Sequence, residues 1–150
     1  MSNIKLDKIF KTACIASDHA GFSLKEDIKN YLINNNYSVF DVGPYTDSSV
    51  DYPDYAKKLG NRIKLKKSDV GILVCGSGTG MAISANKIKT IRAAVCYDLK
   101  STRLSRQHNN ANIIALGSRL TKRKLSLKLV DVFLTTKFEG GRHLKRIKKI

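Results

Sequence analysis

The chain has 150 residues, 42% of them hydrophobic, and carries a formal net charge of +16. This length suits one domain over residues 1–150 with a substantial core, and no apolar run of 18 residues indicates a transmembrane helix. The first residues lack the apolar stretch of a secretory signal and the three cysteines form no CxxC pair, so we expect a reduced, cytoplasmic protein without a disulfide framework or zinc site.

Positive charge accumulates toward the C-terminus. Net charge is −1 in residues 1–50, +6 in residues 51–100 and +11 in residues 101–150. A basic half can indicate nucleic-acid binding, but no motif combines basic and aromatic residues and tryptophan is absent. We therefore expect most of these lysines to lie on solvated helix faces, with neither nucleic acid nor membrane as partner.

Strand-like and helix-like segments alternate along the chain. Expected strands are residues 13–17, 37–42, 70–74, 91–96 and 113–116. Expected helices are residues 22–34, 52–65, 79–87 and 99–108, a long one capped by Thr121 and ending near residue 135, and a basic tail that is helical from Leu144. Short connections between alternating elements predict an α/β, Rossmann-like, doubly wound sheet of five parallel strands with helices on both faces.

The most informative stretch runs from Val70 to Lys87. A short β-branched run ends at Cys75, glycines follow at 76, 78 and 80, and a helix-forming segment comes next. A glycine-rich turn at a helix N-terminus directs backbone N–H groups and partial positive charge at one spot. We expect a group that is anionic, or becomes anionic, to bind there, and the same field favours the thiolate form of Cys75.

Nucleotide-binding motifs fit this stretch poorly. The GxxxxGK[ST] pattern is absent, and GxGxxG would need glycine at Met81 or Ile83. Asp98 does fall about where a ribose-binding acid would lie. A dinucleotide site therefore stays open as a minor alternative.

Polar residues follow the expected strands at their carboxyl ends, where ligands bind in open α/β sheets. Asp18 and His19 follow the first strand, Tyr52 the second, and Cys75 the third. For His19 a structural and a functional role remain equally open.

The C-terminal third adds more candidates. His108 ends an expected helix, where the helix dipole alone would favour it, and His143 by itself fits a solvated basic tail. Arg142 and Arg146 are four residues apart, so on a helix they share one face that suits a phosphate. Together the candidates indicate acid–base chemistry on a small phosphorylated molecule.

At this point a resemblance becomes specific. The chain resembles B-type ribose-5-phosphate isomerases, of the same superfamily as bacterial galactose-6-phosphate isomerase. The matching stretches run in order and cover nearly the whole chain beyond the first dozen residues: Ser-Asp-His-Ala-Gly (17–21), Asp-Tyr-Pro (51–53), Cys-Gly-Ser-Gly-Thr-Gly (75–80), Ala-Asn-Lys (85–87), Ile-Arg-Ala (91–93), Ser-Arg-Gln-His-Asn (105–109), Ala-Asn (111–112), Gly-Ser-Arg (117–119) and Phe-Glu-Gly-Gly-Arg-His (138–143) with Arg146.

The resemblance implies an aldose–ketose isomerase that interconverts D-ribose 5-phosphate and D-ribulose 5-phosphate in the non-oxidative branch of the pentose phosphate pathway. It implies no metal and no organic cofactor. It also implies a homodimer, or a tetramer as the larger alternative, with active sites between subunits. A six-carbon sugar-phosphate isomerase, for allose or galactose 6-phosphate, is the alternative, because pocket depth separates the two substrates and sequence does not give it.

The same resemblance implies roles for individual residues. Cys75 matches the base that moves a proton between C2 and C1, and His108 matches the group that opens the furanose ring, with Asp18 nearby. Ser77 can add a hydroxyl donor to the N–H groups that meet an enediolate. Some relatives carry a glutamate base six positions after Cys75, but that position is Met81 here.

Substrate-binding roles are implied for a larger set. Phosphate contacts match His19, Arg119, Arg142 and Arg146. Sugar contacts match Tyr52 and Asn109, with Asp18 beside them. The loop that stabilises the enediolate matches Gly76, Ser77, Gly78, Thr79 and Gly80.

Overall fold

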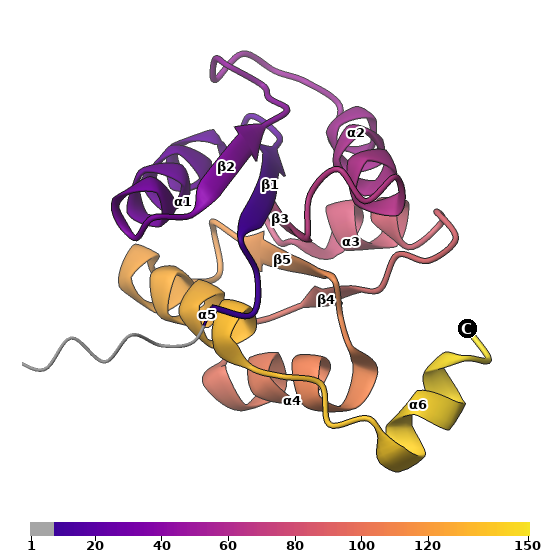
Figure 1. The fold of residues 1–150 in the computed structure, drawn as a ribbon. Coiled ribbons are helices and arrows are strands. Elements are labelled where there is room, and N and C mark those ends of the chain that lie inside the picture. The colour runs from indigo at the N-terminus through magenta and orange to yellow at the C-terminus, as the bar shows by residue number, and fades with distance from the viewer. Residues whose placement is uncertain (1–7) are drawn as a thin grey trace, which may run out of the picture.

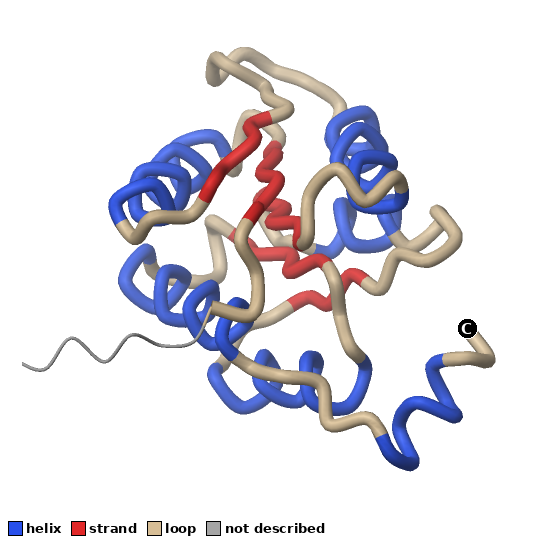
Figure 2. The backbone as a smooth tube through the Cα atoms, viewed as in Figure 1, coloured by secondary structure: helices blue, strands red, loops and turns tan. Residues whose placement is uncertain are grey.

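The computed structural model describes residues 8–150, which form a parallel sheet covered by helices on both sides (Figures 1 and 2). The strands are β1 (Thr12–Ser17), β2 (Ser38–Asp41), β3 (Val70–Cys75), β4 (Ala93–Val95) and β5 (Ile113–Gly117). The helices are α1 (Phe22–Asn34), α2 (Tyr52–Lys64), α3 (Thr79–Ala85), α4 (Leu99–Asn109), α5 (Arg123–Thr135) and α6 (Gly141–Ile147). Every strand pair is parallel and the order is β2-β1-β3-β5-β4, which confirms the predicted α/β fold.

The sheet is buried on both faces, and β1 shows how its sequence achieves this. Ala13 and Ile15 belong to the core between the sheet and helices α1 and α5. Cys14 and Ala16 point the other way, into the core under α2 and α3. A strand that must be apolar on both sides reads as a continuous apolar run, as this one does.

The helices present apolar stripes at helical spacing. In α2 the buried positions are Ala56, Leu59, Gly60 and Ile63. In α5 they are Ser126, Leu129, Val130, Phe133 and Leu134. Helices α1 and α5 cover one face of the sheet and α2 and α3 the other, while α4 packs beside α5 and α6 lies against α4 at the margin of the molecule (Figure 1).

A buried ion pair fixes the end of β2. Lys25 on α1 has no exposed surface, and its Nζ lies 2.9 and 2.8 Å from the two carboxylate oxygens of Asp41. The same Nζ donates to the carbonyl oxygen of Pro44 at 2.7 Å. Burial raises the pKa of Asp41, but hydrogen bonds from Lys25, Lys29 and the Gly43 N–H outweigh it and lower that pKa overall. A lone buried lysine would be costly, and the pair makes it tolerable.

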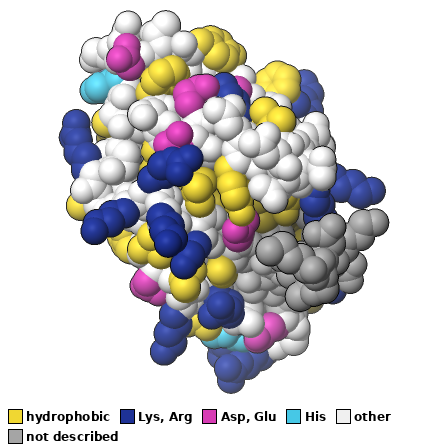
Figure 3. Space-filling view, turned by 90° about the vertical axis from the view of Figure 1, so that its left-hand side faces the viewer, with side chains coloured by type: hydrophobic (Ala, Val, Ile, Leu, Met, Phe, Trp, Pro, Cys, Tyr) yellow, Lys and Arg dark blue, Asp and Glu magenta, His cyan; other side chains and the backbone are white. Residues whose placement is uncertain are grey.

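The surface is basic but not of one sign. On the face with α1 and α5, Lys and Arg side chains gather, with fewer Asp and Glu side chains between and around them (Figure 3). Two ion pairs on this face are Lys29–Glu26 and Arg123–Asp27, each at 2.8 Å. Within residues 8–150, no helix combines the length and the apolar character needed to cross a bilayer.

Most expected boundaries differ from the structure by one or two residues, as for the helix expected at 79–87, which ends at Ala85. Three differences concern the second half of the chain. The strand expected at residues 91–96 is only Ala93–Val95. The Arg92 N–H before it binds the side-chain oxygen of Asn112, and the Ala93 N–H binds that of Asn86. Thr121 does not cap α5, because the residue before that helix is Lys122. The Thr121 N–H instead donates to the Gly117 carbonyl oxygen in the turn after β5. The tail helix begins at Gly141, not Leu144.

Candidate active site

The carboxyl ends of β1, β3 and β5 meet the start of α2 around one cavity of about 450 Å³. In the sheet, β2 and β3 flank β1 on opposite sides. The edge at this change of direction is the switch point at which open α/β sheets bind ligands. The lining residues are Asp18, Tyr52, Cys75, Gly76, Ser77, Gly80, Arg119 and Leu120. Seven of these are positions that the sequence singled out, and only Leu120 was not.

Cys75 sits at the end of a strand that is buried along its whole length, and its side chain is held by the loop that follows. Its Sγ accepts a hydrogen bond from the Gly78 N–H at 3.0 Å, and the residue is only 4% exposed. Gly78 has φ +80°, a left-handed conformation that costs a residue with Cβ about 1–2 kcal/mol. The glycine therefore lets the chain turn its N–H back onto the sulfur, where it stabilises negative charge.

The rest of the glycine loop is fitted closely to its neighbours. A Cβ at Gly80 would lie 2.8 Å from the Tyr52 ring, and a Cβ at Gly117 would lie 2.8 Å from the Ser77 backbone. The Tyr97 hydroxyl donates to the Ser77 carbonyl oxygen at 3.0 Å. The loop is thus packed between α2 and β5, so its N–H groups are held in fixed directions.

Asp18 is buried and serves the backbone of its own turn. It is 8% exposed, and its Oδ1 accepts the Gly21 N–H at 2.9 Å. Its own N–H donates to the Val74 carbonyl oxygen at 3.1 Å, which ties the end of β1 to β3. Asp18 is also one of the residues that line the cavity.

His19 is oriented by the loop after β2 and is not among the residues that line the cavity. The Val50 N–H donates to His19 Nδ1 at 3.3 Å. With Nδ1 acting as acceptor, a neutral ring carries its proton on Nε2, which can donate to a ligand.

The other two cysteines lie in the core. Burial raises the pKa of Cys14 to about 12, and burial also raises the pKa of Cys96. All three cysteines are free thiols. These shifts favour the protonated thiol for Cys14 and Cys96, whereas Cys75 lines the cavity at the sheet edge.

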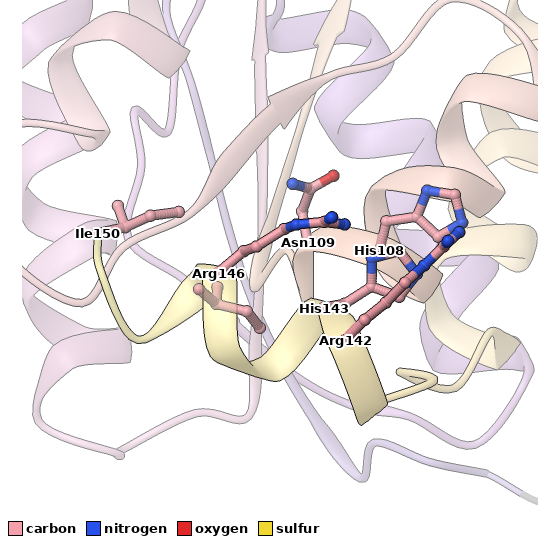
Figure 4. Close-up of a pocket in the computed structure, with 7 residues that line it drawn as sticks. His108, Asn109, Arg142, His143, Arg146 and Ile150 are labelled. Atoms are coloured by element: carbon pink, nitrogen blue, oxygen red, sulfur yellow. The ribbon is translucent and has the colours of Figure 1, made fainter.

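A second cavity, of about 350 Å³, lies between the end of α4 and α6 (Figure 4). His108 and Asn109 contribute from α4, and Arg142, His143, Arg146 and Ile147 from α6, with Ile150 beyond it. The imidazole rings of His108 and His143 are stacked with centroids 4.2 Å apart and an angle of 12° between the planes. The structure thus groups four predicted residues here: His108, Asn109, Arg142 and Arg146.

His143 was misjudged from the sequence. Alone it fitted a solvated tail, yet it is 8% exposed and stacked on His108. The spacing of His143 and Ile147, four residues apart on one helix face, is the signal that could have shown an inward side of this tail.

A metal would find three potential ligands in this second cavity. Ligand atoms of His108, Glu139 and His143 lie within 4.8 Å of one another. The two rings, however, are stacked with nearly parallel planes, whereas imidazoles that share one metal ion have planes that meet at it. The arrangement is therefore not a formed metal site, and the absence of a metal from the chemistry stays a prediction.

Comparisons with known proteins agree on one family. A family model described as Ribose/Galactose Isomerase matches residues 13–150. Ribose-5-phosphate isomerase B of Escherichia coli is 41% identical over 140 residues, which are 93% of this chain and 94% of that protein.

Solved structures give the same result. The ribose 5-phosphate isomerase of Thermotoga maritima is 52% identical with a TM-score of 0.90, over 92% of this chain and 95% of that one. Ribose-5-phosphate isomerase B from Mycoplasma genitalium, solved with bound ribulose-5-phosphate, is 44% identical with a TM-score of 0.88 over 92% of each chain.

Proposed function

The chain belongs to the ribose/galactose isomerase family, and we propose that it interconverts D-ribose 5-phosphate and D-ribulose 5-phosphate. One observation carries the proposal: Cys75 Sγ is held by the Gly78 N–H in a cavity at the switch point of the sheet. The bound ribulose-5-phosphate in the Mycoplasma genitalium relative supports a pentose phosphate as the substrate.

Proton transfer between carbons is the central step. The Cys75 thiolate takes the C2 proton of the open-chain aldose, and the C–H electron pair forms the C1–C2 double bond. The carbonyl oxygen O1 becomes the enediolate oxygen, whose charge the N–H groups of the glycine loop and the Ser77 hydroxyl meet. The hydroxyl on C2 passes its proton to O1, and the Cys75 thiol returns its proton to C1, which gives the ketose. No oxidant or reductant is consumed.

Ring opening precedes this step. We assign it to His108, because an imidazole can take the anomeric hydroxyl proton and return one to the ring oxygen near neutral pH. The carboxylate of Asp18, held by the Gly21 N–H, lies on the cavity wall and supports this transfer. Tyr52 and Asn109 would contact the sugar hydroxyls.

The phosphate would be held by His19, Arg119, Arg142 and Arg146. Guanidinium groups suit this role because each presents a planar fork of N–H donors. Arg142 and Arg146 lie in the cavity beside α6, whereas Arg119 lies in the cavity with Cys75. One substrate needs both sets of residues.

We therefore propose a homodimer in which α4 and α6 of one subunit complete the Cys75 cavity of its partner, with a tetramer of such dimers as the larger alternative. Two cavities that each hold part of one catalytic set support this arrangement. A two-fold axis then builds two identical composite sites.

The setting follows from the same proposal. Three unpaired thiols suit a reducing compartment, and we place the enzyme in the cytoplasm, in the non-oxidative branch of the pentose phosphate pathway. The decisive test measures turnover of ribose 5-phosphate with allose 6-phosphate beside it. Turnover of neither substrate at micromolar enzyme would refute the proposal, and a preference for allose 6-phosphate would move it to the six-carbon alternative.

A further inference from the structure

The helix with the two phosphate arginines is attached to the rest of this chain at very few points. Of the residues in α6, only His143 is buried. Gly140 and Gly141, just before it, have φ of +67° and +53°, and a Cβ at either would meet nothing within 4 Å. The space beside both glycines is therefore open, and no packing there holds the helix in place.

His143 contacts the residue to which we assign ring opening. Its ring lies face to face with that of His108, at 4.2 Å between centroids (Figure 4). One backbone hydrogen bond accompanies this stack, from the Glu139 N–H to the Gln107 carbonyl oxygen at 3.1 Å. A stacked aromatic pair contributes stabilisation beyond the area it buries.

We propose that His143 is a positioning residue whose stacked ring docks α6 on α4, and so couples the phosphate arginines to the ring-opening histidine. The inference rests on the proposed function for the roles of His108, Arg142 and Arg146. One side chain then does two things. It fixes the plane of the His108 ring, and it sets where the guanidinium groups of α6 stand relative to that ring.

The charges around the stack make this docking depend on pH. Desolvation, His108, Arg142 and Arg146 lower the pKa of His143, and only Glu139 opposes them, with its carboxylate 3.7 Å from His143 Nε2. A neutral His143 can stack on a protonated His108, whereas two stacked cations repel each other. Because the docked state disfavours the proton on His143, docking is complete above about pH 6.5, the value for a free histidine, and weakens as pH falls below it.

Two substitutions separate stacking from other roles. His143→Phe keeps an aromatic ring but removes the titrating nitrogens, and His143→Ala removes both. Lys145→Ala, on the exposed side of the same helix, is the matched control. The measurements are hydrogen exchange of the amides of residues 142–147, and NMR titration of the imidazole signals, which number three because the chain has three histidines.

We expect His143→Ala to reduce exchange protection in α6 by about tenfold, to shift the His108 signal by loss of the neighbouring ring current, and to raise KM. His143→Phe and Lys145→Ala should keep protection and KM within about twofold of wild type. At about pH 5.5 the α6 amides of the wild type should lose protection while those of His143→Phe keep it. The imidazole of His143 takes up a proton at this pH, and a phenyl ring cannot.

Two results would overturn the inference. In one, His143→Ala leaves the exchange of α6 and the His108 signal unchanged. In the other, His143→Phe keeps α6 docked but loses as much turnover as His143→Ala, which would mean that His143 acts on the substrate through its nitrogens. Exchange and NMR need no substrate, so failure of the docking inference is distinguishable from failure of the proposed isomerase activity.

Discussion

Cys75 offers the sharpest test of the proposed chemistry, because two substitutions separate its role as base from its role in the loop. Cys75→Ala removes the sulfur and leaves the Gly78 N–H, now bonded to Sγ at 3.0 Å, without that partner. Cys75→Ser keeps an acceptor at nearly the same place, but its hydroxyl ionises far too weakly to act as a base. The two variants should differ in stability and agree in activity.

The expected stability difference follows from the burial of this site. Cys75 is 4% exposed, and a buried N–H without a partner costs about 1–3 kcal/mol. In a chain of this size each kcal/mol lowers Tm by about 2–4 °C. Calorimetry should therefore place Cys75→Ala a few degrees below wild type and Cys75→Ser close to it.

The expected loss of activity is the same for both variants. Removing a positioned general base should lower kcat on ribose 5-phosphate by ~10² or more. Exchange of substrate C–H protons with D₂O should disappear as well. His108→Ala should differ, because it impairs use of the cyclic sugar but spares this exchange when an open-chain form is supplied. Near-full turnover by either Cys75 variant would show that another residue is the base. Equal destabilisation of the two would refute the role assigned to the hydrogen bond.

Three further predictions follow. Mixing equal amounts of Cys75→Ala and His108→Ala subunits should restore about a quarter of wild-type turnover, since half of the dimers would each hold one intact composite site out of two. A mixture no more active than the separate variants would mean that each site lies within one chain. Arg146→Ala should mainly raise KM, because losing a charge-assisted contact costs about 1.5–3 kcal/mol, or roughly 10- to 150-fold; unchanged kinetics would return the tail to a solvated face. Asp41→Asn should cost about 3 kcal/mol at pH 7, because it removes the carboxylate 2.8 Å from the buried Lys25 Nζ and leaves only that of Glu26, at 3.2 Å. Because the pKa of Asp41 is lowered, the wild-type advantage should shrink as pH falls below about 4 and disappear only below the lowered pKa of the folded state. Urea unfolding that shows an equal advantage at pH 7 and pH 3 would contradict this.

Local sequence determined the elements and one half of the candidate site. The short apolar runs of β1 and β3 predicted strands buried on both faces, and the spacing of apolar residues in α2 and α5 defined their inward stripes. The cysteine and glycines after β3 could be recognised without a structure, because the strand, the left-handed turn and the helix start are set by neighbouring residues.

The ends of the strands were harder to predict from the sequence, because contacts with residues far along the chain decide them. Ile91 and Cys96 look like strand residues, yet β4 spans only Ala93–Val95, and the distant Asn112 side chain takes the N–H of Arg92 just before it. The position of β5 between β3 and β4 likewise depends on contacts between strands far apart in the sequence.

Only the tertiary structure decided how the candidate residues are grouped. In the sequence, Cys75, His108 and Arg146 were one catalytic set, but the fold divides them between two cavities. It also turns His143 from a tail residue into the buried partner of His108. The physical reason is the same in both cases: local patterns specify which side of an element is apolar, whereas the neighbour that covers this side is chosen by packing across the whole chain.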